Sequence, residues 1–149
     1  MTELKRQQNG MLYNPLKVHI PQYSEKKELV RKFNASAGIS VMERMDFLRK
    51  VFAHMGTRAY IEPPFYCDHG WKISVGDNFY ANTGFLVLDE AEVNIGNNAF
   101  ISPRERIKAV SEGVSIEANR VKHCIAALSN FEKYERHHSY GRCRFLLTH

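Results

Sequence analysis

The sequence predicts a mainly β fold in which a helical N-terminal region leads into an incomplete parallel β-helix. Apolar residues recur every six positions in two parallel columns, a period that neither an α-helix nor a simple strand produces. The columns are Ile73, Phe79 and Phe85, and Val75, Ala81 and Val87. Segment 75–82 then returns twenty residues later as segment 95–102, with its aliphatic-Gly-x-Asn start kept. Six-residue repeats suit the short, flat sides of a β-helix, and two extra residues near 88–90 account for a period of twenty instead of eighteen.

The first sixty residues are predicted to be helical. Residues 24–33 form an amphipathic segment with Leu29, Val30 and Phe33 on one face. A second helix is expected to begin at Ser40, because Ser40 and Glu43 have the spacing of a capping box.

An apolar stripe follows in this second helix, and Gly56 is its expected C-terminal stop. The stripe consists of Met42, Met45, Leu48, Phe52 and Met55. We expect it to pack against the β-helix, rather than to form a methionine-rich groove for a partner.

Composition narrows the class of protein further. A chain of 149 residues can bury one modest core. It has no long apolar run and no signal-like start, so we expect a cytoplasmic protein without a membrane span. Three widely spaced cysteines support neither a disulfide framework nor a metal site. The net charge of +5 lies mostly in residues 104–149, where nine Lys/Arg face five Asp/Glu, so no nucleic-acid partner is expected.

The six-residue columns stop after Ile107. Residues 114–116 could be the remnant of one further side, but Arg120 and Lys122 occupy later inward positions and are costly to bury. We therefore expect three segments: a helical domain (1–60), hexapeptide-repeat coils (61–107) and a divergent, poorly ordered tail (108–149).

Several motifs, in this order, resemble those of the maltose and galactoside O-acetyltransferases, which are hexapeptide-repeat acyltransferases. The motifs are Gly10-x-Leu12-Tyr13-Asn14, Phe33-Asn34, Ile61-Glu62-Pro63-Pro64-Phe65-x-Cys67-Asp68-x-Gly70 and Asn78-Phe79-Tyr80-Ala81-Asn82. The resemblance covers residues 8–103. It implies a left-handed parallel β-helix, a homotrimer, and transfer of an acetyl group from acetyl-CoA to a sugar hydroxyl, without a metal.

The same resemblance implies an acceptor-sugar site. Asn82 and Asp89 match polar groups that hold the sugar, and Asp68 and Tyr80 are weaker candidates in the same cleft. Each residue also has a structural interpretation. Asn82 occupies a corner position and Asp89 could cap a turn, whereas Asp68 could pair with a neighbour and Tyr80 could be ordinary packing.

No catalytic residue is assigned. The family places its histidine base where this chain reads Ala109-Val-Ser-Glu-Gly113, which contains no histidine. His123, His137 and His138 lie further along, but none precedes a proline. The resemblance therefore implies a sugar O-acetyltransferase with impaired activity or a truncated gene, and the alternative is a non-catalytic sugar-binding or assembly module.

Overall fold

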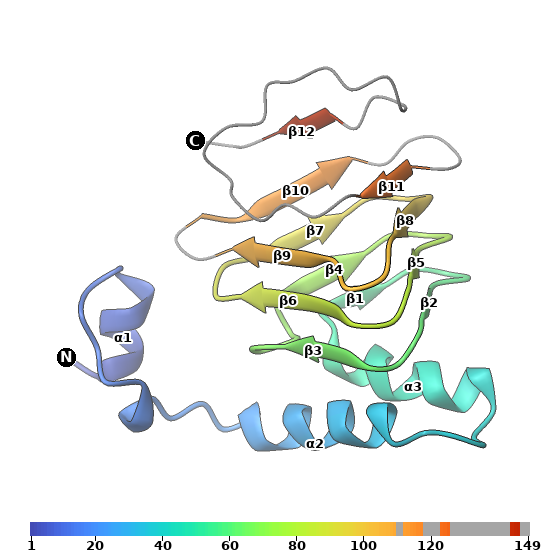
Figure 1. Cartoon of the computed structure of the whole chain (residues 1–149). Coiled ribbons are helices and arrows are strands. Elements are labelled where there is room, and N and C mark those ends of the chain that lie inside the picture. The colour runs from blue at the N-terminus through green and yellow to red at the C-terminus, as the bar shows by residue number, and fades with distance from the viewer. Residues whose placement is uncertain (110–111, 118–122, 126–143, 147–149) are drawn as a thin grey trace.

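The computed structural model of the chain describes residues 1–109, 112–117, 123–125 and 144–146, and it contains a three-sided stack of strands above a helical base (Figure 1). In chain order the elements are α1 (Glu3–Gln8), the 3₁₀ helix η1 (Pro15–Lys17), α2 (Tyr23–Asn34), α3 (Val41–Val51), β1 (His54–Met55), β2 (Tyr60–Ile61), β3 (Phe65–Cys67), β4 (Ile73–Val75), β5 (Tyr80–Ala81), β6 (Phe85–Asp89), β7 (Val93–Ile95), β8 (Ala99–Ile101), β9 (Arg106–Ala109), β10 (Val114–Glu117), β11 (His123–Ile125) and β12 (Arg144–Leu146).

The strands form three sheets, one for each side of a solenoid. Their orders are β1-β4-β7-β10, β2-β5-β8-β11 and β3-β6-β9, and β12 joins the first sheet antiparallel to β10. In the first coils, paired residues lie twenty apart along the chain: Ile73 pairs with Val93, Tyr80 with Phe100 and Leu86 with Arg106. Apart from β12, all these pairings are parallel, which confirms the β-helix predicted from the sequence.

The two extra residues of each coil lie where the sequence predicted them. Buried Val75, Ala81 and Val87 are six residues apart, but the next equivalent, Ile95, follows after eight. The added length extends β6 and the corner behind it, and it brings the carboxylate of Asp89 inside the coil.

The solenoid continues beyond the boundary expected at residue 107. Ala109, Val114 and Ile116 are buried, and β10 pairs with β7 in parallel. Residues 114–116 are the further side that the sequence left open, and counting onward by six did not reach them because the corner is longer than the period assumes. Val114 pairs with Val93, an interval of twenty-one residues. Most of the segment expected to be poorly ordered, including residues 118–122 and 126–143, lies outside the described residues.

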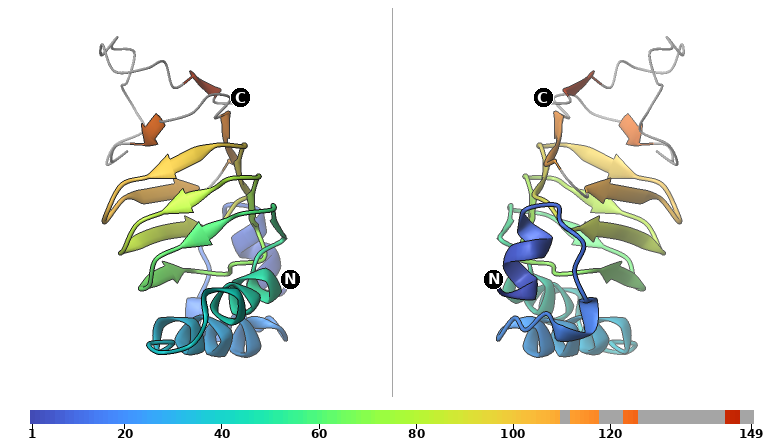
Figure 2. Two further views of the ribbon diagram at one scale, coloured as in Figure 1. Left: turned by 90° about the vertical axis from the view of Figure 1, so that its right-hand side faces the viewer. Right: turned by 90° about the vertical axis from the view of Figure 1, so that its left-hand side faces the viewer.

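Helices α2 and α3 close the end of the solenoid opposite β10 (Figure 2). Both predicted helices are present, and they pack through a shared set of buried side chains. These are Val30, Phe33, Met45, Leu48 and Val51. A solenoid end without such a cap leaves its apolar face in water, so the helices stabilise the first coil.

The predicted stripe of α3 is correct only in part. The helix ends at Val51, and Met55 lies in β1, so Gly56 is not the helix stop. Met42 is 81% exposed, because it lies on the outer face of the first turn. Phe52 and Met55 are also buried, but they belong to the segment that follows the helix. Their spacing matches the helical pattern by coincidence.

The predicted capping box is confirmed: the Ser40 hydroxyl accepts the Glu43 N–H, and the Glu43 carboxylate accepts the Ser40 N–H. Replacing Ser40 by alanine is expected to lower the free energy of unfolding by about 1 kcal/mol, because one helix-end N–H loses its acceptor. Urea unfolding followed by circular dichroism measures this. The control is Met42→Gln on the same exposed turn, which should change stability by less than about 0.5 kcal/mol.

Stacked corners align polar side chains from successive coils. Asn78 and Asn98 both adopt positive φ, at 54° and 60°, and the Asn78 Nδ2 donates to Asn98 Oδ1 over 2.8 Å. Asparagine tolerates this left-handed backbone better than most residues. The Gly-x-Asn motif is therefore a device for turning the chain at this corner.

Candidate functional site

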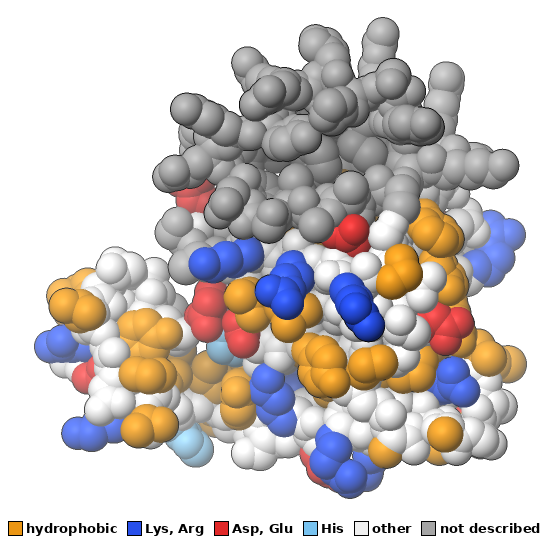
Figure 3. Space-filling view, viewed as in Figure 1, with side chains coloured by type: hydrophobic (Ala, Val, Ile, Leu, Met, Phe, Trp, Pro, Cys, Tyr) orange, Lys and Arg blue, Asp and Glu red, His pale blue; other side chains and the backbone are white. Residues whose placement is uncertain are grey.

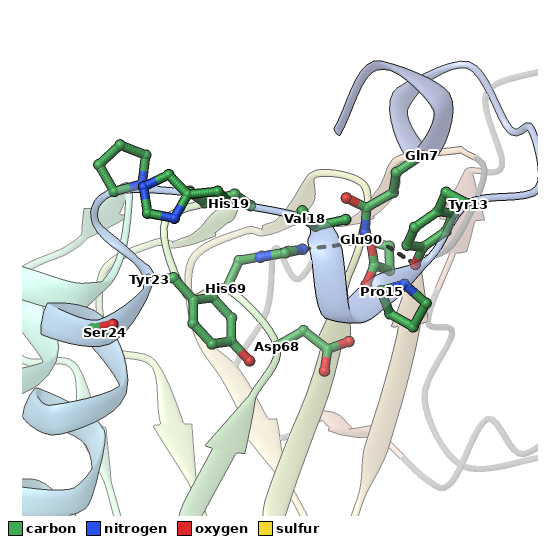
Figure 4. Close-up of a pocket in the computed structure, with 12 residues that line it drawn as sticks. Gln7, Tyr13, Pro15, Val18, His19, Tyr23, Ser24, Asp68, His69 and Glu90 are labelled. Atoms are coloured by element: carbon green, nitrogen blue, oxygen red, sulfur yellow. Dashed lines mark hydrogen bonds and ion pairs between the residues drawn. The ribbon is translucent and has the colours of Figure 1, made fainter. Parts of the chain in front are cut away.

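A cavity of about 350 Å³ lies between the N-terminal arm (residues 7–24) and the third corner, which is the turn of the coils that follows strands β3 and β6. Its wall from the coils contains Asp68, His69 and Glu90. The arm contributes Gln7, Tyr13, Pro15, Val18, His19, Ile20, Pro21, Tyr23 and Ser24. Figure 4 shows these side chains gathered from two parts of the chain that are distant in sequence. A volume of this size accommodates a small polar ligand.

Hydrogen bonds attach the arm to the corner. Gln7 Nε2 donates to Glu90 Oε2 over 2.6 Å and lies 3.2 Å from the Tyr13 hydroxyl. The Glu3 carboxylate, in α1, accepts the N–H of the arm residue Asn14 over 2.6 Å. These hydrogen bonds hold the arm against the third corner, and Glu90 is the corner residue to which the arm is bonded.

Asp89 has a structural position beneath this pocket. Its side chain is fully buried. Oδ1 accepts the N–H groups of Asp68 and His69 over 3.0 and 2.9 Å, and Oδ2 accepts that of Gly70 over 2.7 Å. This is the turn-capping role that the sequence left open for Asp89. Asp89 therefore shapes the corner that presents the pocket residues.

Asp68 faces the pocket. Burial raises the pKa of its carboxyl, and the nearby carboxylates of Glu90 and Asp89 raise this pKa further, against the opposing effect of Lys27 and His69. No hydrogen bond from a described residue reaches its side chain. Because the half-buried Asp68 carboxylate has no hydrogen-bond partner among the described residues, it is available to a ligand.

Because its folded-state pKa is raised, ionised Asp68 opposes folding at neutral pH. The folded chain binds this proton more tightly than the unfolded chain, so the favourable contribution exists at low pH and is lost as pH rises through the folded pKa. Asp68→Asn is therefore expected to stabilise the protein at neutral pH and to lose this advantage in acid. Thermal unfolding of both proteins across that pH range measures the difference. A stability difference that does not change with pH would contradict the raised pKa.

His69 lines the pocket in a nearly buried position, 6% exposed. Its Nε2 lies 3.4 Å from Glu90 Oε2. Its ring contacts Trp71, with centroids 4.8 Å apart, and Tyr23, at 6.3 Å. Figure 4 shows the ring between Tyr23 and Glu90. His69 is the x position of the motif Cys67-Asp68-x-Gly70, so the motif did not mark it as a pocket residue.

The other two predicted site residues lie on a different side of the solenoid. Tyr80, in β5, stacks between Tyr60 and Phe100, with centroid distances of 5.9 and 4.8 Å. Asn82 Oδ1 accepts the N–H of Thr83 over 2.8 Å, a contact within the corner. Neither residue lines the arm pocket, so within one chain the predicted residues divide into two groups.

Other chemistry is limited among the described residues. No group of three or more His, Cys, Asp or Glu in this part of the chain could hold a metal ion. Burial raises the pKa of the Cys67 thiol to about 12, so it is not a nucleophile at neutral pH. Within the described residues, every helix is too short or too polar to cross a membrane.

Comparisons with known proteins agree on one class. Two solved structures share the fold: a maltose O-acetyltransferase from Clostridium difficile 630 (TM-score 0.61, 32% identity, 71% of this chain and 57% of that one) and a hexapeptide-repeat acetyltransferase from Vibrio cholerae complexed with acetyl coenzyme A (TM-score 0.59, 29% identity, the same coverages). The solenoid is therefore that of the hexapeptide-repeat acetyltransferases.

Sequence relatives narrow this class. The galactoside O-acetyltransferase of Escherichia coli K12 is 32% identical over 121 residues, which are 80% of this chain and 59% of that enzyme. No protein-family model matches the chain. In sequence and fold, the chain is similar to the maltose and galactoside O-acetyltransferases. It spans 60% or less of the length of the curated relatives that it matches.

Proposed function

We propose that the chain binds a sugar acceptor in the arm pocket and serves acetyl transfer from acetyl-CoA to a hydroxyl of that sugar. The observation that carries the proposal is the polar cavity at the third corner, in a chain similar to these enzymes. A neighbouring structure in the class is complexed with acetyl coenzyme A, which supports the same donor for this protein.

The pocket groups suit a polyol. Carboxylates of Asp68 and Glu90 accept hydrogen bonds from hydroxyl groups, and the amide of Gln7 can donate or accept. The rings of Tyr13 and Tyr23 offer apolar surface to a sugar face. Asn82 and Tyr80 stay proposed acceptor contacts, and they would reach the sugar from a neighbouring subunit if the family homotrimer forms.

Acetyl transfer requires a base that removes the proton of the attacking hydroxyl and donors that stabilise the oxyanion. The segment from Ala109 to Gly113 lacks the histidine that the family resemblance places there. This observation favours a second candidate function, in which the chain binds the sugar without turning it over.

Two parallel measurements separate the candidates. Sugar binding is measured by calorimetry with glucose, maltose and a galactoside, and acetyl transfer is measured by release of free thiol from acetyl-CoA with the same sugars. Binding with turnover supports the enzyme, whereas binding without turnover supports the non-catalytic module. If no sugar binds, both candidates are wrong. Sedimentation of the same samples tests the homotrimer.

A further inference from the structure

The polar lining of the arm pocket is unbalanced in charge. Asp68 and Glu90 lie in its wall, and neither lysine nor arginine is among the described residues that line it. The chain as a whole carries a net charge of +5, so this is a local acidic site on a basic protein. In the space-filling view, acidic side chains gather at the seam between the arm and the coils (Figure 3).

Two lysines beside this corner, Lys27 and Lys72, are engaged with backbone carbonyls. Lys27 donates to the carbonyl of Cys67 over 2.5 Å, and Lys72 donates to that of Glu90. Lys27 lowers the pKa of Asp68, but burial and the two neighbouring carboxylates raise it by more. The negative potential of the pocket is therefore only partly neutralised by the protein.

The pocket wall also contains a buried acceptor that no described residue satisfies. With a carboxylate oxygen of Glu90 facing Nε2 of His69, the proton of the neutral ring belongs on Nε2, and Nδ1 is left as an acceptor. Nδ1 is buried and has no hydrogen-bond partner among the described residues. A buried acceptor without a donor is unfavourable by about 1–3 kcal/mol, so a ligand that brings N–H groups is favoured here.

We infer that the pocket selects a sugar acceptor that carries a protonated amino group, held between the carboxylates of Asp68 and Glu90. An ammonium supplies three N–H donors and the positive charge that no lysine or arginine supplies among the described lining residues. The ring of Tyr13 adds a surface near which a cation is stable, whereas the ring of Tyr23 already has Lys27 Nζ over it at 5.2 Å. This specificity rests on the proposed function, because it names the class of acceptor for the same site.

Three matched sugars test the inference by calorimetry in a neutral buffer of low ionic strength. Glucosamine carries the ammonium, glucose replaces it by a hydroxyl, and N-acetylglucosamine keeps the nitrogen without the charge. Glucosamine is expected to bind at least about tenfold more tightly than either neutral sugar, because charge-assisted hydrogen bonds are about twice as strong as neutral ones. Added salt should reduce this preference.

The variant Asp68→Asn removes one pocket charge and is expected to stay folded, since the ionised carboxylate opposes folding. It should lose most of the preference for glucosamine over glucose, because an amide carries no charge to pair with the ammonium. The matched control is Asp46→Asn, which removes the same charge from an exposed position on α3 and should keep the preference.

A second ligand pair separates this inference from the proposed function. Cyclohexylamine and cyclohexanol carry the same contrast of charge on a ring that is not a sugar. Preference for the amine in this pair, without binding of any sugar, supports the ammonium site and overturns the sugar acceptor. Equal binding of glucosamine and glucose overturns the inference and leaves sugar binding standing. If neither pair binds, both are overturned. An equal loss of preference in Asp46→Asn would also overturn the inference, because the effect would then be general electrostatics.

Discussion

Replacing Gly76 by alanine is expected to lower the free energy of unfolding by at least about 3 kcal/mol, the upper end of the range for overpacking. An added Cβ would lie 2.3 Å from Asn97 Oδ1 and 2.8 Å from both Asn97 N and Gly96 C. Most of these atoms belong to the backbone of the next coil and cannot rotate away. Asn97 Oδ1 also accepts the Asp77 N–H over 2.7 Å, a bond that the new methyl group would displace.

Urea unfolding measures this loss, and Gly38→Ala is its control. Gly38 has a positive φ of 85° but no atom near the added Cβ, so its substitution tests backbone strain without the clash. That strain is expected to amount to about 1 kcal/mol. Equal effects in the two variants would mean that the coils can separate at the corner at little cost.

Replacing Asp89 by asparagine is expected to lower stability by about 3 kcal/mol, because buried groups bonded to a charge lose a partner. The carboxylate accepts three backbone N–H groups from Asp68, His69 and Gly70. An amide has one acceptor oxygen, so its NH₂ group must face at least one of these donors. The corner that carries Asp68 and His69 should loosen, and ligand binding in the pocket should weaken with it.

Asp77→Asn is the matched control. The Asp77 carboxylate accepts only the N–H of Thr57 among the described residues, it is exposed, and an asparagine oxygen can keep this bond. Asn97 already has the same role one coil further on. This variant should change stability by less than about 0.5 kcal/mol. A similar loss in both would show that Asp89 contributes through its charge alone and not through the three bonds.

The sequence predicted the solenoid because its period is a local property. The apolar residues six apart and the repeated Gly-x-Asn corners indicate the fold without information about distant contacts. The start of α3 was equally local, because the capping box needs only Ser40 and Glu43. The end of α3 could not be predicted in this way, because Met55 continues the helical spacing although it is a buried residue of strand β1.

The pocket could be predicted only in part. Asp68 was predicted because it belongs to a motif. The contact between Gln7 and Glu90 spans 83 positions of sequence, and no sequence pattern predicts it. Capping and sugar contact were both open for Asp89 until its burial and its three donors were known. The third coil was underestimated because a corner can lengthen by one residue without leaving a signature in the apolar columns.

The constant interval between paired residues has a consequence for how such a gene can change. In the first coils, residues twenty apart occupy equivalent places in successive layers. Duplication or loss of one whole repeat therefore adds or removes a layer and leaves every remaining neighbour in register. A one-residue insertion within a strand would instead turn the inward side chains in the rest of that strand to the surface, so the chain can grow in whole layers more readily than by single residues inside strands.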